Sequence, residues 1–238
     1  MTRRARLATW ILVGGPILVF SLWALVDNPR LYLVTMLNSL TLASLYFIVA
    51  SGFTLVFGLM RNVNLAHGSL YLLGGYVGYV VARETGWWII SLAAGFLAAA
   101  VAGVLIQVLI LRRMQGQDLR QTMVTIGLSI VIADILLWIF TGQVYQMEAP
   151  SWLQGPIRGI PVIKAYSAYR LSLLGFGIAI GIFLWFLLNR TKVGMMIRAG
   201  VDDRAMLAAA GVNVNLVFAI TFMLGAGLAG FGGVIGAV

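Results

Sequence analysis

The chain lacks the residues on which most catalytic and metal sites depend. Its 238 residues include no cysteine, a single histidine and seven carboxylates. Without cysteine there are no disulfides, thiolate metal sites or cysteine nucleophiles, and one histidine cannot form a multi-histidine metal site. No G-x-x-x-x-G-K-[ST] phosphate loop occurs, so the chain cannot hydrolyse ATP through a P-loop. We expect no catalysis by this chain and no cofactor.

Charge is scarce as well. Charged residues make up 10% of the chain and hydrophobic residues 61%, whereas a soluble domain carries about 25% charged residues. Such a chain cannot cover a globule with polar groups, so its solvent is lipid. The net charge of +9 fits a membrane protein that gathers Lys and Arg in its cytoplasmic loops. No basic patch with interleaved aromatics points to nucleic acid.

Seven apolar runs are each long enough to cross a bilayer, which needs about 20 mostly apolar residues. They predict an all-α, polytopic transmembrane bundle that forms one integral membrane domain over residues 1–238, with an N-terminal span in 1–30 and a core in 31–238. The predicted spans are 7–26, 31–57, 66–82, 87–111, 121–140, 169–189 and 214–238. The first run also resembles a signal peptide, but its length and the lack of an A-x-A site favour a retained helix.

Lys and Arg predict the orientation of these spans. With a cytoplasmic N-terminus, 11 basic residues lie inside and 5 outside, and three of those five lie in the single long loop 141–170. Because basic residues concentrate in cytoplasmic loops, the N-terminus is expected inside.

Asp134, in TIGLSIVIADILLWIF, is the exception in an otherwise uncharged interior. A carboxylate in lipid is costly unless it is paired, protonated or hydrated, so such residues are candidates for function. We consider Asp134 a candidate for lining a solute path. The structural alternative is a protonated side chain that donates to a neighbouring helix, or one that reaches outward.

A second group of polar residues, Asn62, Asn64, His67 and Ser69, interrupts the apolar pattern where two spans meet on the inner side. Polar backbone at membrane depth is tolerated where protein or a water-filled cavity satisfies it. This segment is therefore either a short loop or a partly unwound entry to a cavity, and its polar residues are candidates for a solute path. For His67 alone, a hydrogen-bonded structural histidine is the favoured alternative.

Glycine is abundant, with 28 residues. Gly74 and Gly78 form a G-x-x-x-G on one helix face, which permits close backbone approach. The last span carries six glycines within 12 residues, Gly230, Gly232 and Gly233 among them. Each glycine costs up to about 1 kcal/mol against alanine in a helix, so this density predicts tight packing. A glycine-broken helix along a solute path is the alternative.

The polar insert RTKVGMMIRAGVDDRAMLAAAGVNVN, residues 190–215, separates two apolar runs. Its spacing predicts a first short helix whose apolar face comprises Val193, Met196 and Ile197, interrupted by Gly200. Asp202 or Asp203 can then cap a second short helix.

The second helix is expected to run through RAMLAAA and to stop at Gly211, a residue suited to a left-handed cap. A membrane-surface amphipathic helix is the alternative for the insert, although its two central acids fit that arrangement less well. The adjacent pair Asp202 and Asp203 is no acid–base dyad, because neighbouring helical side chains point about 100° apart.

This insert resembles the cytoplasmic coupling loop of ABC importer permeases, and most closely that of the branched-chain amino acid permeases (the LivH/LivM family). SGFTLVFGLMRNVNLAHGSLYLLGGYVG (Ser51–Gly78) is similar to the signature near the first core helices of that family, and TIGLSIVIAD to its mid-chain helix. The likeness extends from about Leu37 to the end of the chain, with the blocks in family order.

The resemblance implies a bacterial inner-membrane permease subunit that imports branched-chain amino acids. Its implied partners are a second homologous permease, two ABC ATPase subunits and a periplasmic solute-binding protein. Closure of the ATPases on ATP would push on the loop and switch the cavity from outward-facing to inward-facing. By match to the family loop, the residues that fit the ATPase are Gly194, Arg198, Ala199, Asp203, Ala205, Ala210 and Gly211.

The chain departs from the family pattern in two places. Asp-Arg-Ala stands where importer loops often read Glu-Ala-Ala, and the chain stops at Val238, where the family continues with another glycine-rich stretch and a final helix. A truncated product or an incomplete sequence is therefore expected.

A secondary transporter and a membrane anchor subunit are the rival functions, and urea, amides and aromatic acids are the alternative solutes.

Overall fold

The computed structural model describes residues 3–60, 64–114, 116–159, 163 and 165–238. Apolar runs fold as helices because a helix satisfies its backbone hydrogen bonds internally in lipid. The long helices are α1 (Arg3–Asp27), α2 (Pro29–Met60), α3 (His67–Thr85), α4 (Trp88–Leu105), α5 (Asp118–Phe140), α6 (Ala168–Arg190) and α9 (Val214–Gly236). The fold is the predicted all-helical polytopic bundle, and each predicted span corresponds to one of these helices.

Five helices in the described part of the chain are long and apolar enough to cross a membrane. They are Pro29–Gly58, Trp88–Met114, Asp118–Phe140, Ala168–Arg190 and Val214–Gly236. Within α1, Gly14–Asp27 forms a shorter apolar segment. Helix α3 is not among the five, and it carries His67 at its start and Arg83 and Glu84 near its end. For α1 and α3, crossing of the membrane stays a prediction.

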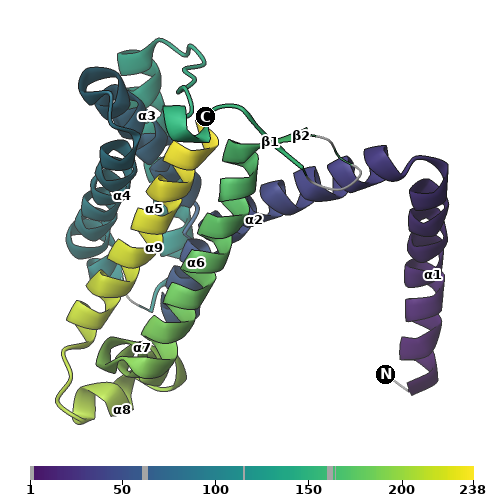
Figure 1. Ribbon diagram of the computed structural model, residues 1–238. Helices are drawn as coiled ribbons and strands as arrows, with labels where there is room; N and C mark the ends of the chain where they lie inside the picture. The colour runs from purple at the N-terminus through teal and green to yellow at the C-terminus, as the bar shows by residue number, and fades with distance from the viewer. Residues whose placement is uncertain (1–2, 61–63, 115, 160–162, 164) are drawn as a thin grey trace.

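Helix α9 lies at the centre of the bundle (Figure 1). It packs against α2, α3 and α4, and α3 in turn packs against α4. Its side chains Phe218, Phe222 and Ile235 are almost fully buried. On the side of α6, the Tyr169 hydroxyl donates to the backbone carbonyl of Ile235 at 2.7 Å. The core of the protein is thus organised around α9.

Helix α1 stands apart from this bundle, at the far end of α2 (Figure 1). It contacts α2, and its large apolar side chains are open: Leu18 is 60% exposed, Phe20 65% and Trp23 60%. A contiguous apolar surface of this kind requires lipid or another membrane subunit around it.

The segment between α5 and α6 contains structure that the sequence pattern did not predict. Strands β1 (Pro156–Arg158) and β2 (Ala165–Ser167) pair antiparallel, after a 3₁₀ turn, η3 (Ser151–Leu153). Strands of three residues are too short to show an alternating pattern. The backbone N–H of Met147 donates to the carbonyl of Ala237 at 2.8 Å, which joins this loop to the end of α9.

The polar insert forms two short helices, as predicted: α7 (Lys192–Asp202) and α8 (Arg204–Ala209). The Thr191 hydroxyl caps α7 by accepting from the Gly194 N–H at 3.1 Å. The Asp203 carboxylate caps α8 by accepting from the N–H groups of residues 205 and 206 at 2.8 and 3.0 Å. Gly211 follows α8 with φ +82°, the left-handed conformation expected at this stop.

One part of the prediction for the insert was wrong. Gly200 does not interrupt the first helix, because α7 continues through it to Asp202. A helical glycine costs only about 1 kcal/mol relative to alanine. The predicted apolar face packs against the core, with Ile197 buried and Val193 and Met196 partly buried, and this burial offsets that cost.

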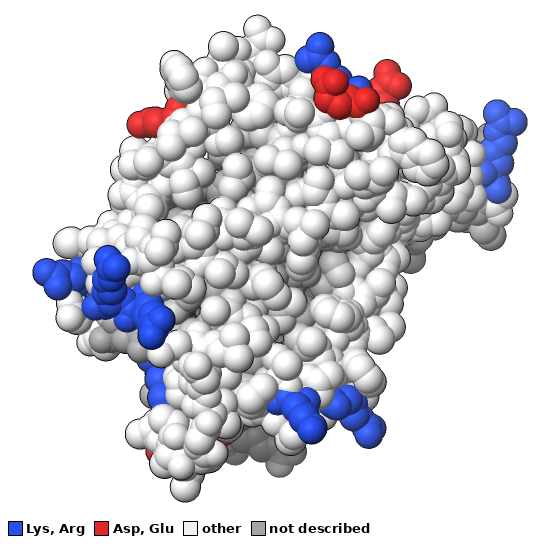
Figure 2. Space-filling view, turned by 90° about the vertical axis from the view of Figure 1, so that its left-hand side faces the viewer, with Lys and Arg blue, Asp and Glu red and all other residues white. Residues whose placement is uncertain are grey.

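The polar loops sort onto the two ends of the bundle. Arg112 and Asn213 line a pocket beside the start of α9, at the end of the bundle that carries α7 and α8. Arg83 and Glu148 line a different pocket at the other end. Figure 2 shows most of the basic side chains on the lower half of this face and most of the acidic ones at its upper end, where some basic side chains also lie. The more basic end is the one expected to face the cytoplasm.

Candidate functional site

A glycine seam (Gly74, Gly78, Gly230, Gly232 and Gly233) joins α9 to its neighbours. A Cβ added at Gly74 would collide with the backbone of Gly230, and one at Gly78 with a methyl group of Val234. A Cβ at Gly230 would collide in turn with the backbone of α4. Helix backbones approach this closely only where side chains are absent.

The other two glycines of the seam face different helices. A Cβ at Gly232 would lie 2.6 Å from a methyl group of Val49 on α2, and one at Gly233 would collide with the carbonyl of Tyr71 on α3. All five glycines singled out from the sequence therefore lie at contacts of α9. Because α9 is continuous from Val214 to Gly236, its glycines do not break the helix.

The sequence analysis missed the glycines that oppose this seam. A Cβ at Gly52 of α2 would lie 2.5 Å from the Gly225 carbonyl, and Cβ atoms at Gly95 and Gly103 of α4 would collide with Val234 and Ala226. A spacing of four residues from Gly95 through Ala99 to Gly103 was a detectable signal, since small residues at that spacing mark close helix contacts.

A buried polar cluster lies where α2, α3 and α5 meet. His67 donates from Nε2 to the Val49 carbonyl at 3.1 Å, and the Ser69 hydroxyl donates to the Ser129 carbonyl at 2.9 Å. Asn64, His67 and Ser69 are all buried. Asn64 Nδ2 and His67 Nδ1 have no hydrogen-bond partner among the described residues, which leaves a buried donor and a buried acceptor without a partner in this part of the chain.

Asp134 does not join this cluster. It lies on the exposed face of α5, together with Ile130, 57% exposed, and Trp138, 84% exposed. Asn62, the remaining candidate for the solute path, lies outside the described residues. The structure thus brings together Asn64, His67 and Ser69 and leaves Asp134 apart from them.

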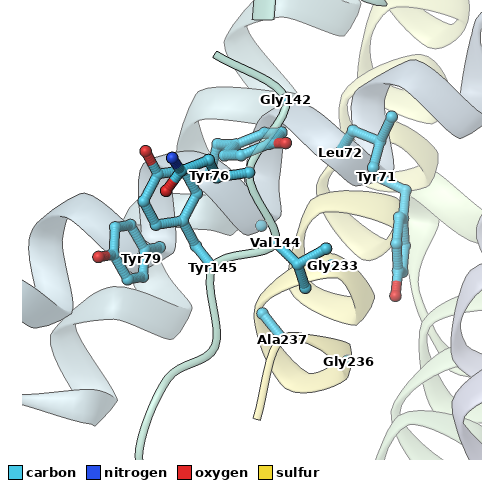
Figure 3. A pocket seen from close by; sticks show the side chains of 12 residues that line it. Tyr71, Leu72, Tyr76, Tyr79, Gly142, Val144, Tyr145, Gly233, Gly236 and Ala237 are labelled. Atoms are coloured by element: carbon cyan, nitrogen blue, oxygen red, sulfur yellow. The ribbon is translucent and has the colours of Figure 1, made fainter. Parts of the chain in front are cut away.

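An aromatic pocket of about 270 Å³ lies between α3, the loop after α5 and the end of α9 (Figure 3). Tyr76, Tyr79 and Tyr145 gather on one side of it, and Tyr71 lies across from them, beyond Gly233. The rings of Tyr79 and Tyr145 have centroids 4.7 Å apart, and the Tyr145 hydroxyl donates to a backbone carbonyl at 3.3 Å.

No charged side chain is among the described residues that line this aromatic pocket. Aromatic and apolar walls with a few hydroxyl groups suit the apolar part of a small solute. Tyr71, Tyr76 and Tyr79 lie within the predicted span 66–82, and the sequence analysis did not single them out. Three tyrosines within nine residues were the available signal, but Tyr145 and the end of α9 reach the pocket only through the tertiary fold.

At the opposite end, a pocket of about 250 Å³ lies beside a π-helical turn, η1 (Ile106–Ile110), which a 3₁₀ turn, η2 (Leu111–Met114), follows. Gln107 of η1 lines it and is 2% exposed, and its Oε1 has no partner among the described residues. Such π turns recur at functional sites. No group of three or more metal-ligating side chains was found in the described part of the chain.

The insert presents a surface of charged and small side chains at the end of the bundle that carries α7 and α8. Of the residues expected to meet an ATPase, those exposed are Arg198, Ala199, Asp203, Ala205, Ala210 and Gly211. Gly194 is buried instead, because a Cβ there would collide with the backbone at the end of α6. The Arg204 guanidinium lies 4.8 Å from the ring centroid of Phe218, which ties α8 to α9.

Helices this apolar need lipid around them, and buried polar groups within such a bundle are candidates for a transport function. Residues 35–238 match the model of the family described as branched-chain amino acid transport system / permease component. The match covers most of the chain, and the chain belongs to this family.

Similar proteins carry names that agree with the family. The chain is 25% identical over 221 residues to the high-affinity branched-chain amino acid transport system permease protein BraD of Pseudomonas aeruginosa. The aligned residues cover 86% of this chain and 70% of BraD. The chain is 27% identical over 223 residues to the permease protein LivH of Escherichia coli K12, with the same coverage. No solved structure gives a significant match.

Proposed function

We propose that this chain is the inner-membrane permease subunit of an ATP-driven importer for branched-chain amino acids, with a cytoplasmic N-terminus. The observation that carries the proposal is the insert of α7 and α8, which is rigidly capped, anchored by Gly194 and by the Arg204–Phe218 contact, and exposed on its outer face. A membrane anchor would not require so ordered a surface on the end of the central helix.

The exposed face of the insert is the docking surface for separate ATPase subunits. Arg198 and Asp203 give it both signs of charge, and the small side chains of Ala199 and Ala205 let a partner approach closely. ATP is hydrolysed on the partner chains, and this chain responds by rigid-body motion between two states. A periplasmic solute-binding protein delivers the solute at the opposite end.

A second homologous permease covers the exposed face of α5. The Asp134 carboxylate on that face would be costly against lipid, and the apolar side chains of Ile130 and Trp138 beside it offer contact area to a partner helix. In that arrangement Asp134 lines a solute path between the subunits, and residues 31–238 form the core of one permease domain.

The solute follows from the relatives and from the aromatic pocket. The relatives are named as permeases for branched-chain amino acids, and the uncharged aromatic wall of Tyr76, Tyr79 and Tyr145 suits a branched apolar side chain. Asn64, His67 and Ser69 contribute the polar groups at the inner end of the path.

Reconstitution tests the whole proposal. The full chain is placed in proteoliposomes with its second permease, its ATPases and its binding protein, and uptake of radiolabelled leucine is measured. Because hydrolysis on the ATPases drives the conformational switch, uptake is expected to require ATP and to cease when the ATPases are left out. Uptake that an ion gradient drives without ATPases would identify a secondary transporter instead. Transport of urea, an amide or an aromatic acid in place of leucine would reassign the solute.

Asp134→Asn tests the role of the α5 carboxylate in this system. The change keeps the shape of the side chain and removes its charge, so assembly is expected to persist while the uptake rate falls about tenfold, the effect of roughly 1.4 kcal/mol on a barrier. Asp118→Asn, at the start of the same helix, is the matched control and should leave uptake unchanged. Wild-type uptake in Asp134→Asn would remove the charge from the mechanism.

A further inference from the structure

Another pocket, of about 470 Å³, lies where the turn from α3 to α4 meets the loop after α5, and we call it the outer pocket. Gly86 makes that turn possible with φ +71°, the left-handed conformation that glycine adopts without strain. The turn brings Arg83, at the end of α3, and Trp88, at the start of α4, to the same hollow. Glu148 approaches it from the loop.

The pocket holds charges of both signs that do not pair with each other. Arg83 and Glu148 are exposed, and within the described part of the chain neither side chain makes a hydrogen bond or an ion pair. Two unpaired opposite charges around one cavity are complementary to a small molecule that itself carries both charges.

Trp88 forms part of the wall of the same cavity. Its side chain is only 6% exposed, and its Nε1–H is buried without a hydrogen-bond partner among the described residues. The indole is held in place by edge contacts with Trp152 and Tyr169, at centroid distances of 6.3 and 6.0 Å. The indole therefore forms a fixed aromatic wall of the cavity.

We propose that this outer pocket binds the zwitterionic head of an α-amino acid, a further inference that rests on the proposed function. Arg83 receives the carboxylate, and Glu148 receives the ammonium group. Tyr79 lines both this pocket and the aromatic pocket. The head of the amino acid therefore sits beside an uncharged cavity into which its apolar side chain fits, and the two pockets together form an entry site.

Analogues that each lack one charge test this assignment in the full chain, embedded in nanodiscs without the binding protein. Binding of L-leucine, N-acetyl-L-leucine and L-leucinamide is measured by titration calorimetry for the wild type and for Arg83→Gln and Glu148→Gln. N-acetyl-L-leucine keeps the carboxylate alone, and L-leucinamide keeps the ammonium alone. Both substitutions lie at exposed positions, so the fold should persist.

Arg83→Gln is expected to weaken leucine and N-acetyl-L-leucine about tenfold, as loss of a charge-assisted hydrogen bond does, and to leave L-leucinamide unchanged. Glu148→Gln should weaken leucine and L-leucinamide and spare N-acetyl-L-leucine. Glu84→Gln, which removes a charge next to Arg83 but outside the pocket, is the control and should bind all three as the wild type does.

Equal binding of leucine by the wild type and both variants, or no saturable binding by the wild type, would overturn the entry site. Failure of the proposed function can be distinguished from failure of the entry site. ATP-dependent uptake of leucine by the complete assembly, without binding at this pocket, would remove the entry site alone. Binding with the expected charge dependence, but without ATP-dependent uptake, would remove the importer assignment and retain the site.

Discussion

Gly74→Val and Gly230→Val are each expected to abolish the stably folded protein. A valine at either position must push apart two helix backbones that touch directly in the glycine seam, and α9 is the helix on which α2, α3 and α4 all pack. Overpacking a core typically costs about 1–3 kcal/mol, and more where backbones must move. The measurement is the monodisperse fraction of the detergent-solubilised chain by size-exclusion chromatography, before and after heating.

Gly127→Val on α5 is the matched control for these two variants. It introduces the same side chain into a membrane helix, but a Cβ at Gly127 has no heavy atom within 4 Å. It should therefore leave the elution profile and the heat stability close to those of the wild type. If Gly74→Val proved as monodisperse and as heat-resistant as Gly127→Val, the close approach of α3 to α9 would be refuted.

Arg198→Glu and Gly211→Val are expected to lower ATP-dependent uptake at least about tenfold while the membrane bundle stays folded, a loss of roughly 1.4 kcal/mol or more in coupling. Arg198 is exposed on α7 and donates to the Asn189 side chain at 3.1 Å, so reversal of its charge alters the docking surface. Gly211 has φ +82°, a conformation that strains valine and would displace α8. Uptake and co-purification of the ATPases with the full chain are both measured.

Two controls separate the docking surface from general effects of charge and strain. Arg113→Glu reverses an exposed charge on η2, outside the insert. Gly116→Val places the same strained residue, at φ +80°, in another loop. Both should retain uptake and association. Retained association and retained uptake in both Arg198→Glu and Gly211→Val would mean that the insert does not transmit the work of the ATPases.

Features encoded locally were predictable from the sequence. The spans follow from long apolar runs, and the two short helices of the insert from the cap at Asp203 and the stop at Gly211. Gly200 was misjudged because its cost was counted without the burial of Ile197 on the same helix. Local propensity therefore set the ends of the helices correctly and underestimated what packing tolerates between them.

The pockets were not predictable in the same way. The aromatic pocket unites α3 with Tyr145 and with the end of α9, and the outer pocket sets Arg83 beside Glu148, residues 65 positions apart in the printed sequence. Neither proximity follows from periodicity, because both depend on how the loop after α5 folds back over the bundle. Conversely, Asp134 and His67 stood out in the sequence, yet the structure places one on an outer face and the other in a buried cluster.

The unbroken course of α9 has a mechanical consequence. Its 23 residues make a rod of about 35 Å at 1.5 Å per residue, with no hinge along it. One end follows the turn after α8, and the other holds Met147 through the carbonyl of Ala237 at 2.8 Å. We therefore expect a displacement of α8 along the axis of α9 to shift the loop that lines the outer pocket, since an unbroken helix absorbs little motion along its own axis.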